Sequence, residues 1–193
     1  MKKALFPVAI AVALVALGLP SRALADAALS VSSPPTVAQG STFDVEVDIS
    51  GAADLFAYEL DLDFNPSVLQ ATGTITEGTF FQSGGGFFPG TVDNTAGTIT
   101  FNADTLLGPG PGLTGGGQLI VFEFNALAAG TSELDLANII LLDSNLDSLD
   151  FISTGGSVMV TGSGPVPTPE PSTLLLLASV IGTVGLLGIF KRA

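Results

Sequence analysis

The chain has 193 residues and a net charge of -13, with 24 glycines, 12 prolines and no cysteine, histidine or tryptophan. None of its five Lys and Arg residues lies between Asp26 and Gly164, where 17 carboxylates lie. Such an acidic surface repels nucleic acid and excludes it as a partner. The missing His, Cys and central Lys exclude Ser-His-Asp, Cys-His and Ser-Lys nucleophiles.

Residues 1–25 have the three parts of a secretory signal peptide. Two lysines precede an apolar run that ends at Leu19, and the A-x-A site Ala23-Leu24-Ala25 follows. We therefore expect a signal helix that is cleaved between Ala25 and Asp26, and a mature protein that is exported. The alternative is a retained N-terminal anchor, for which the apolar run is short.

Residues 26–164 are predicted to form one domain of short strands. Apolar and polar residues alternate with a period of two in TFDVEVDIS, YELDLDF, TITFNAD and QLIVFEFNA. This alternation is typical of strands with one buried face. The predicted buried positions are Phe43, Val45, Val47, Ile49, Tyr58, Leu60, Leu62, Phe64, Ile99, Phe101, Ile120, Phe122 and Phe124. Because turn residues separate these runs and no amphipathic helix precedes the tail, we expect an all-β, antiparallel β-sandwich.

A cluster of oxygen-bearing side chains lies between residues 143 and 150. The stretch begins like the D-x-N-x-D of an EF-hand loop, but Ser148 and Thr154 stand where that loop has its Gly and Glu. Since no basic side chain offsets the carboxylates of the domain, bound divalent cations are favoured. The candidate calcium ligands are Asp143, Asn145, Asp147 and Asp150. The alternative is a polar hairpin turn, and no other cofactor is expected.

The order of several motifs resembles that of cohesin domains. Gln39-Gly40-Ser41 precedes a Val-rich strand, and Phe64 to Leu69 fits an aromatic-Asp-Pro-x-x-Leu motif with Asn65 in place of Asp. Gly117 to Phe124 and Gly156 to Val160 fit two later strands. The resemblance implies a jelly-roll sandwich of about nine strands, related in shape to some carbohydrate-binding modules. It also implies a face that holds dockerin domains, because cohesins bind dockerins through one exposed sheet face.

The strand Ala57 to Phe64 corresponds to part of the binding face of cohesins. Its outward residues Ala57, Glu59, Asp61 and Asp63 are therefore candidate contacts for a dockerin-like protein partner. The alternative is a carbohydrate-binding module that attaches to extracellular polysaccharide. Paired carboxylates could still hydrolyse a glycoside. However, the carboxylates fall on polar strand faces and the domain has no Trp platform, so we expect a non-catalytic module.

The tail after residue 164 has three parts. A proline-rich linker spans 165–172, an apolar helix at the short limit of transmembrane length spans 173–190, and a basic cytoplasmic stub spans 191–193. With the motif Pro169, Glu170 and Pro171, this order resembles the PEP-CTERM sorting signal of Gram-negative bacteria. The resemblance implies processing by an exosortase and a precursor held transiently in the inner membrane. Delivery to the cell surface or the extracellular matrix would follow.

Overall fold

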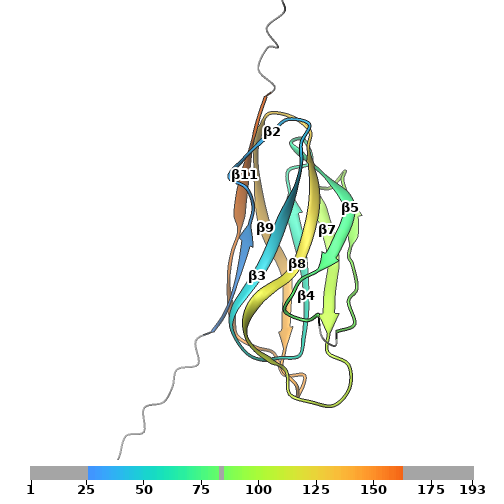
Figure 1. Ribbon diagram of the computed structural model, residues 1–193, viewed down its shortest axis with the longest axis vertical. Helices are drawn as coiled ribbons and strands as arrows, with labels where there is room; N and C mark the ends of the chain where they lie inside the picture. The colour runs from blue at the N-terminus through green and yellow to red at the C-terminus, as the bar shows by residue number, and fades with distance from the viewer. Residues whose placement is uncertain (1–25, 83–84, 163–193) are drawn as a thin grey trace, which may run out of the picture.

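The alternating runs form strands in two facing sheets (Figure 1). The computed structural model describes residues 26–82 and 85–162. The predicted signal peptide, proline-rich linker, transmembrane helix and basic stub, including Ala25 and the motif at 169–171, lie outside these residues. Within the two described ranges, no helix is long and apolar enough to cross a membrane.

The strands are β1 (Ala27–Ser32), β2 (Thr36–Ala38), β3 (Thr42–Leu55), β4 (Ala57–Phe64), β5 (Leu69–Glu77), β6 (Thr91–Asp93), β7 (Thr98–Thr105), β8 (Leu113–Ala126), β9 (Gly130–Leu142), β10 (Phe151–Thr154) and β11 (Gly156–Thr161). One sheet has the order β10-β1-β3-β8-β5, and the other has the order β2-β11-β9-β4-β7-β6. The sandwich prediction is therefore confirmed. The described residues form eleven strands rather than about nine, and β2 and β6 have only three residues each.

Two strand pairs depart from the predicted antiparallel arrangement. β1 pairs with β10, and β2 pairs with β11, in parallel. The chain changes sheets between β1 and β2 at Pro34-Pro35, where the prolines provide no N–H groups for a continuous ladder. β10 and β11 change sheets in the same way, so consecutive terminal strands join the edges of both sheets.

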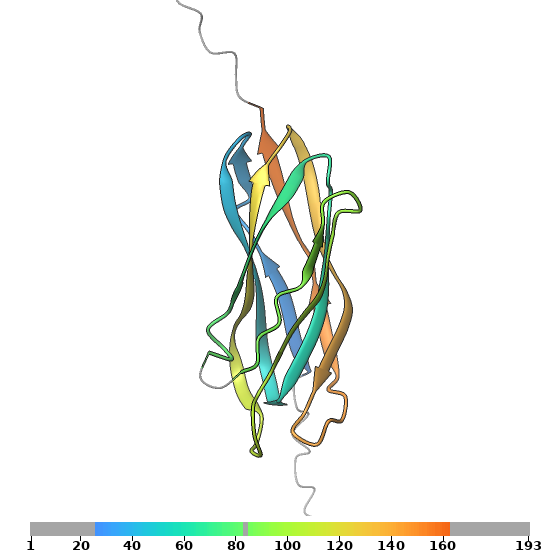
Figure 2. The same cartoon turned by 90° about the vertical axis from the view of Figure 1, so that its right-hand side faces the viewer.

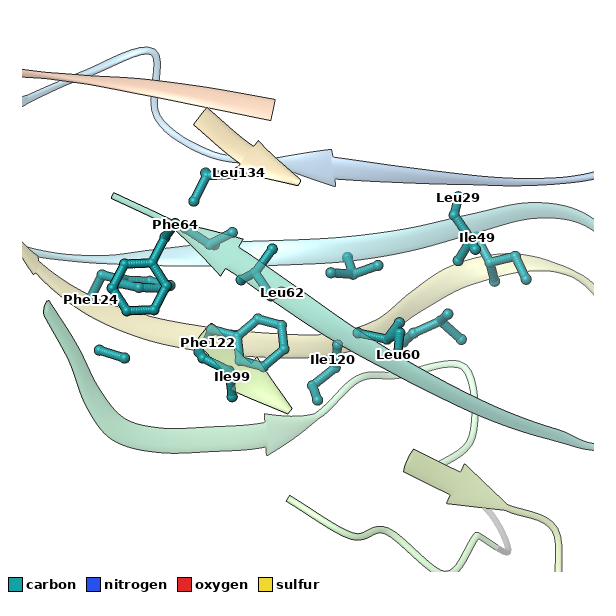
Figure 3. Packing of buried hydrophobic residues seen from close by; sticks show 14 of the residues in the cluster. Leu29, Ile49, Leu60, Leu62, Phe64, Ile99, Ile120, Phe122, Phe124 and Leu134 are labelled. Carbon is teal, nitrogen blue, oxygen red and sulfur yellow. The ribbon is translucent and has the colours of Figure 1, made fainter. Parts of the chain in front are cut away.

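The core lies between the inner faces of the two sheets. Figure 3 shows Leu60, Leu62 and Phe64 of β4 beside Phe122 and Phe124 of β8. The rings of Phe64 and Phe124 meet edge to face, with centroids 5.0 Å apart. The turned view in Figure 2 shows that the described chain enters and leaves at opposite ends of the long sandwich. The outer face of the six-stranded sheet lies along the flank between these ends.

Candidate functional site

The outer face of the six-stranded sheet has β4 at its centre, between β9 and β7. Strand register arranges the outward residues in rows, since alternate residues of a strand share a face. Ala57 lies between Leu142 and Thr105, and the next row places Glu59 between Ile140 and Ala103. Ala57 and Glu59 therefore meet apolar residues of β9, and Glu59 also meets Ala103 of β7.

These two rows form a shallow apolar pocket. Its volume is about 260 Å³, and Phe88 closes one side of it. Phe88 is 61% exposed and Ile140 is 46% exposed. Backbone hydrogen bonds between Phe88 and Ala103 hold the Phe88 segment against β7, with N–O distances of 2.8 and 3.1 Å. The pocket combines exposed apolar side chains with the carboxylate of Glu59, and the buried Asp104 also lines it.

Below the pocket, a β-bulge on each neighbouring strand faces Asp61. Two steps along β4 oppose three steps along β7, from Ile99 to Asn102, and three steps along β9, from Ala137 to Ile140. The extra residue on each neighbour includes a left-handed position, Phe101 at φ 59° and Asn138 at φ 47°. Such bulges reverse the faces of the residues that follow them.

Asp61 fills the space between the two bulges. One carboxylate oxygen accepts the backbone N–H of Phe101 at 2.8 Å, and the other accepts the side-chain amide of Asn138 at 2.6 Å. Asp61 is only 8% exposed. The expectation of an exposed contact residue is therefore wrong for Asp61, because its carboxylate is already used to anchor the bulges. Ala57, Glu59 and Asp63 remain on the outer face.

The bulge also overturns the predicted burial of Phe101. Phe101 is 69% exposed, whereas its neighbour Asn102 is fully buried. Strict alternation from Ile99 predicts Phe101 inside, but the extra residue leaves Thr100 and Phe101 on the same side of the strand. Asn102 is inside without an unmet polar atom. Its amide donates to the carbonyls of Leu60 and Ile99, and its oxygen accepts the Gly90 N–H.

The far end of the outer face is acidic. Asp63 lies directly opposite Asp135 on β9, and Glu133 lines the same shallow cavity. Partial burial raises the pKa of Asp63, and the Asp61 and Asp135 carboxylates raise it further. Like charges directly opposite one another weaken strand pairing. A cation placed here by a partner would relieve this repulsion.

Tyr58 points away from this face, as its alternation predicts. It is 2% exposed, and its ring meets that of Phe81 edge to face at 5.3 Å. Its hydroxyl donates to the carbonyl of Leu119 at 3.0 Å. Burial raises the pKa of this hydroxyl, and the Asp104 and Glu77 carboxylates add to the effect. The Tyr58 side chain therefore belongs to the core.

The candidate calcium ligands lie in the turn between β9 and β10. Asp143 caps this turn, because one of its oxygens accepts the N–H groups of Asn145 and Asp147 at 2.8 and 2.9 Å. Asp150 and Asp143 line the same cavity of about 380 Å³. No group of three or more acidic or metal-binding side chains is arranged to hold a metal ion among residues 26–82 and 85–162. The polar turn is present, and the calcium site stays a prediction.

Sequence patterns miss several residues of the pocket. The available signal is the run Ile139 to Leu142, since an extended strand must turn half of four consecutive apolar residues outward. The missed residues are Phe88, Ala103, Ile140 and Leu142.

A two-sheet sandwich with an apolar pocket on an open sheet face defines a class, the β-sandwich binding module. The family model of the cohesin domain matches residues 27–160. The chain belongs to the cohesin family, and its domain is a non-catalytic module. Among curated proteins, none matches the chain significantly.

Solved structures give the same fold. A non-cellulosomal cohesin from the archaeon Archaeoglobus fulgidus is similar with a TM-score of 0.58 and 21% identity, over 71% of this chain and 92% of that chain. A type II cohesin domain from the cellulosome of Acetivibrio cellulolyticus has a TM-score of 0.59 and 15% identity, over 69% and 95%. The cohesin–dockerin complex of Clostridium thermocellum has a TM-score of 0.57 and 9% identity, over 72% and 95%. At these identities the similarity concerns the fold.

Proposed function

We propose that this chain is an exported, non-catalytic cohesin whose outer β9-β4-β7 face binds a dockerin-like protein. The observation that carries the proposal is the apolar pocket around Ala57, where Phe88 and Ile140 are exposed to solvent. Two structurally similar proteins, from Clostridium thermocellum and Acetivibrio cellulolyticus, are cohesins in complex with dockerins. Exposed apolar groups on an open sheet face are typical of a protein-binding site.

The charges around the pocket define the chemistry of the partner. Glu59 lies in the pocket and Asp63 lies two rows below it, while no Lys, Arg or His lies between residues 26 and 164. A partner that places one apolar side chain in the pocket and a Lys or Arg beside Glu59 fits this face. Electrostatic complementarity of this kind mainly increases the association rate and the specificity.

The test removes the apolar side chains of the pocket. We expect Phe88→Ser with Ile140→Ser to weaken binding at least about tenfold, because buried aromatic and aliphatic contacts carry most interface energy. The partner is first captured by the wild-type chain from the native extracellular fraction and identified by mass spectrometry as dockerin-bearing. Affinities are then measured with the purified partner.

The matched control is Ile152→Ser, which removes another exposed apolar side chain, 59% exposed, from β10 of the other sheet. It should bind like the wild type, and both variants should melt within a small margin of it, since exposed substitutions change stability by about 0.5 kcal/mol or less. Equal affinities for the pocket variant and the wild type would contradict the proposed face.

The alternative function is a carbohydrate-binding module for extracellular polysaccharide. The observation that favours it is a second exposed phenylalanine, Phe101, on the strand that lies beside Phe88. Aromatic side chains on an open face can stack on sugar rings. Retention of the wild type on matrix polysaccharide, together with its loss in Phe101→Ser, would favour this function over protein binding.

The sorting route is the second part of the proposal. It rests on the order of Pro169, Glu170 and Pro171, the apolar run at 173–190 and the basic stub. We expect the extracellular protein to start at Asp26 and to lack residues 174–193, because an exosortase would remove the apolar tail. Mass spectrometry of the intact secreted protein checks both ends, and an extracellular form with the complete tail would contradict exosortase processing.

A further inference from the structure

Asp104 is a buried carboxylate with an unmet oxygen. The residue is 1% exposed, and one carboxylate oxygen accepts the Thr105 N–H at 2.8 Å. The other oxygen, Oδ2, has no hydrogen-bond partner. An ionised carboxylate in such a place loses its hydration without a full replacement, which disfavours the charged form.

A second carboxyl group reaches Asp104 from the opposite sheet. Glu77, the last residue of β5, is paired with Ile120 of β8, which faces the core, and the Glu77 carboxyl raises the pKa of Asp104. Tyr58 of β4 is a further titratable neighbour, because it lies directly opposite Asp104 of β7 in the strand register. The described part of the chain offers no basic side chain to neutralise this pair, because residues 26–164 contain no Lys, Arg or His.

The segment Gly85–Gly90 covers Asp104 and contributes no titratable side chain. A Cβ atom at Gly85 would collide with the Asp104 Oδ1 atom, so the glycine backbone rests directly on the carboxyl group. The segment is held to β7 by hydrogen bonds from the Gly86 N–H to the Thr105 carbonyl and from the Phe88 N–H to the Ala103 carbonyl. Both acceptors are the sequence neighbours of Asp104.

We propose that Asp104 keeps a proton beneath the segment Gly85–Gly90, and that loss of this proton releases the segment from β7. An O–H group on Asp104 Oδ2 that donates to the Glu77 carboxylate gives the unmet oxygen a partner. When the proton leaves, two adjacent carboxylates repel each other under the glycine backbone. The segment then moves to admit water, and Phe88 moves with it. This inference concerns the fold and holds whatever the pocket binds.

The direction of the pH effect follows from the environment of the pair. Burial raises the pKa of Asp104 to about 6, the Thr105 N–H bond opposes this, and the Glu77 carboxyl adds to it. The folded protein therefore holds a proton that the unfolded chain has already lost between about pH 4 and pH 6. The stabilisation is complete at acidic pH and is lost as pH rises through the raised pKa.

The test compares the full chain with Asp104→Asn and Glu77→Gln between about pH 5 and pH 8, on either side of the raised pKa. The wild-type melting temperature should fall by several degrees as pH rises. Asp104→Asn should keep the acidic value throughout, because the amide can donate to Glu77 as the protonated carboxyl does. Glu77→Gln should remove only part of the pH dependence, because burial, the larger cause of the raised pKa of Asp104, remains. Asp44→Asn, which removes an exposed charge from the other sheet, should behave like the wild type.

Hydrogen exchange separates the release of the segment from general destabilisation. Protection of the Gly86 and Phe88 amides, corrected for intrinsic exchange, should fall roughly tenfold at the higher pH in the wild type and stay constant in Asp104→Asn. An Asp104→Asn variant with the pH dependence of the wild type would overturn the proposal. A second outcome would also overturn the proposal: calcium restores the wild-type melting temperature at the higher pH and matched ionic strength, yet leaves Asp104→Asn unchanged. That result would show that a bound cation, rather than a proton, neutralises Asp104.

Discussion

Asp61 and Asp104 are two buried carboxylates of the same sheet, but only Asp61 has a hydrogen-bond partner for both of its oxygens. Asp61 lies on the outer face, and its two oxygens accept hydrogen bonds from Phe101 and Asn138 on the two neighbouring strands. Asp104 lies on the inner face, and one of its oxygens has no partner. The Asp61 carboxylate replaces missing backbone hydrogen bonds and so stabilises the sheet. The Asp104 carboxylate lies beneath a loop without a counter-charge, and so makes the stability of the fold depend on pH.

The two sites are connected through strand geometry. The extra residue at Phe101, which Asp61 anchors, reverses the faces of the rest of β7 and so turns Asp104 inward. The matching bulge on β9 turns Ile140 outward into the pocket. One outward carboxylate thus supports both the apolar pocket and the buried acid on the other side of the sheet.

The largest expected effect comes from breaking the Asp61 anchor. Asp61→Ala removes the acceptor for two donors and leaves the left-handed position at Phe101 without its hydrogen bond. We expect a loss of about 3 kcal/mol in the free energy of unfolding, since bonds to charged groups contribute most and unmet partners add a penalty. Denaturant unfolding at neutral pH measures it.

Two variants sharpen the result for Asp61. Asp61→Asn keeps one acceptor oxygen and should lose about half as much stability. Asp63→Ala removes an exposed carboxylate of the same strand, next to Asp135, and should leave stability unchanged or slightly raised. If Asp61→Ala cost no more than Asp63→Ala, the bulges would hold without the Asp61 carboxylate.

Sequence periodicity predicts the sandwich wherever strands pair without interruption. Phe122 and Phe124 alternate with the polar residues Glu123 and Asn125, and both phenylalanines are fully buried. The prediction fails at Phe101, because a bulge adds one residue without any signal such as Gly or Pro at that position. Only the partner strand, through Asp61, specifies where the extra residue lies.

Only the β4 part of the candidate face could be predicted from the sequence, because that strand alternates without interruption. The β4 residues Ala57, Glu59 and Asp63 lie outward because their alternation is regular. The contribution of β9 was hidden, since Ile140 would face the core without the bulge. Asp104 resembles the other strand carboxylates in sequence, and its burial likewise depends on three-dimensional pairing. Local sequence predicts the face of a residue only up to the nearest register shift.

Two aspartates that cap turns extend the comparison and carry the smallest expected effect, which concerns calcium binding. Asp93 and Asp143 each cap a turn with one oxygen that accepts two backbone N–H groups. They differ in their neighbours, because Asp143 is followed within the turn by Asp147, while Asn94 and Thr95 follow Asp93. If carboxylate crowding recruits calcium, only the Asp143 turn should respond to it.

We expect calcium at about ten times its Kd to stabilise the wild type by about 1.4 kcal/mol, which is the linkage value for one site. The variant with Asp143→Asn and Asp147→Asn should lose this gain, and Asp93→Asn should keep it. Melting temperatures are compared at matched ionic strength, because screening by simple salt would raise all three. An equal rise in the three proteins would show that calcium only neutralises the acidic surface diffusely, and that the Asp143 turn, like the Asp93 turn, needs no ion beyond its own backbone donors.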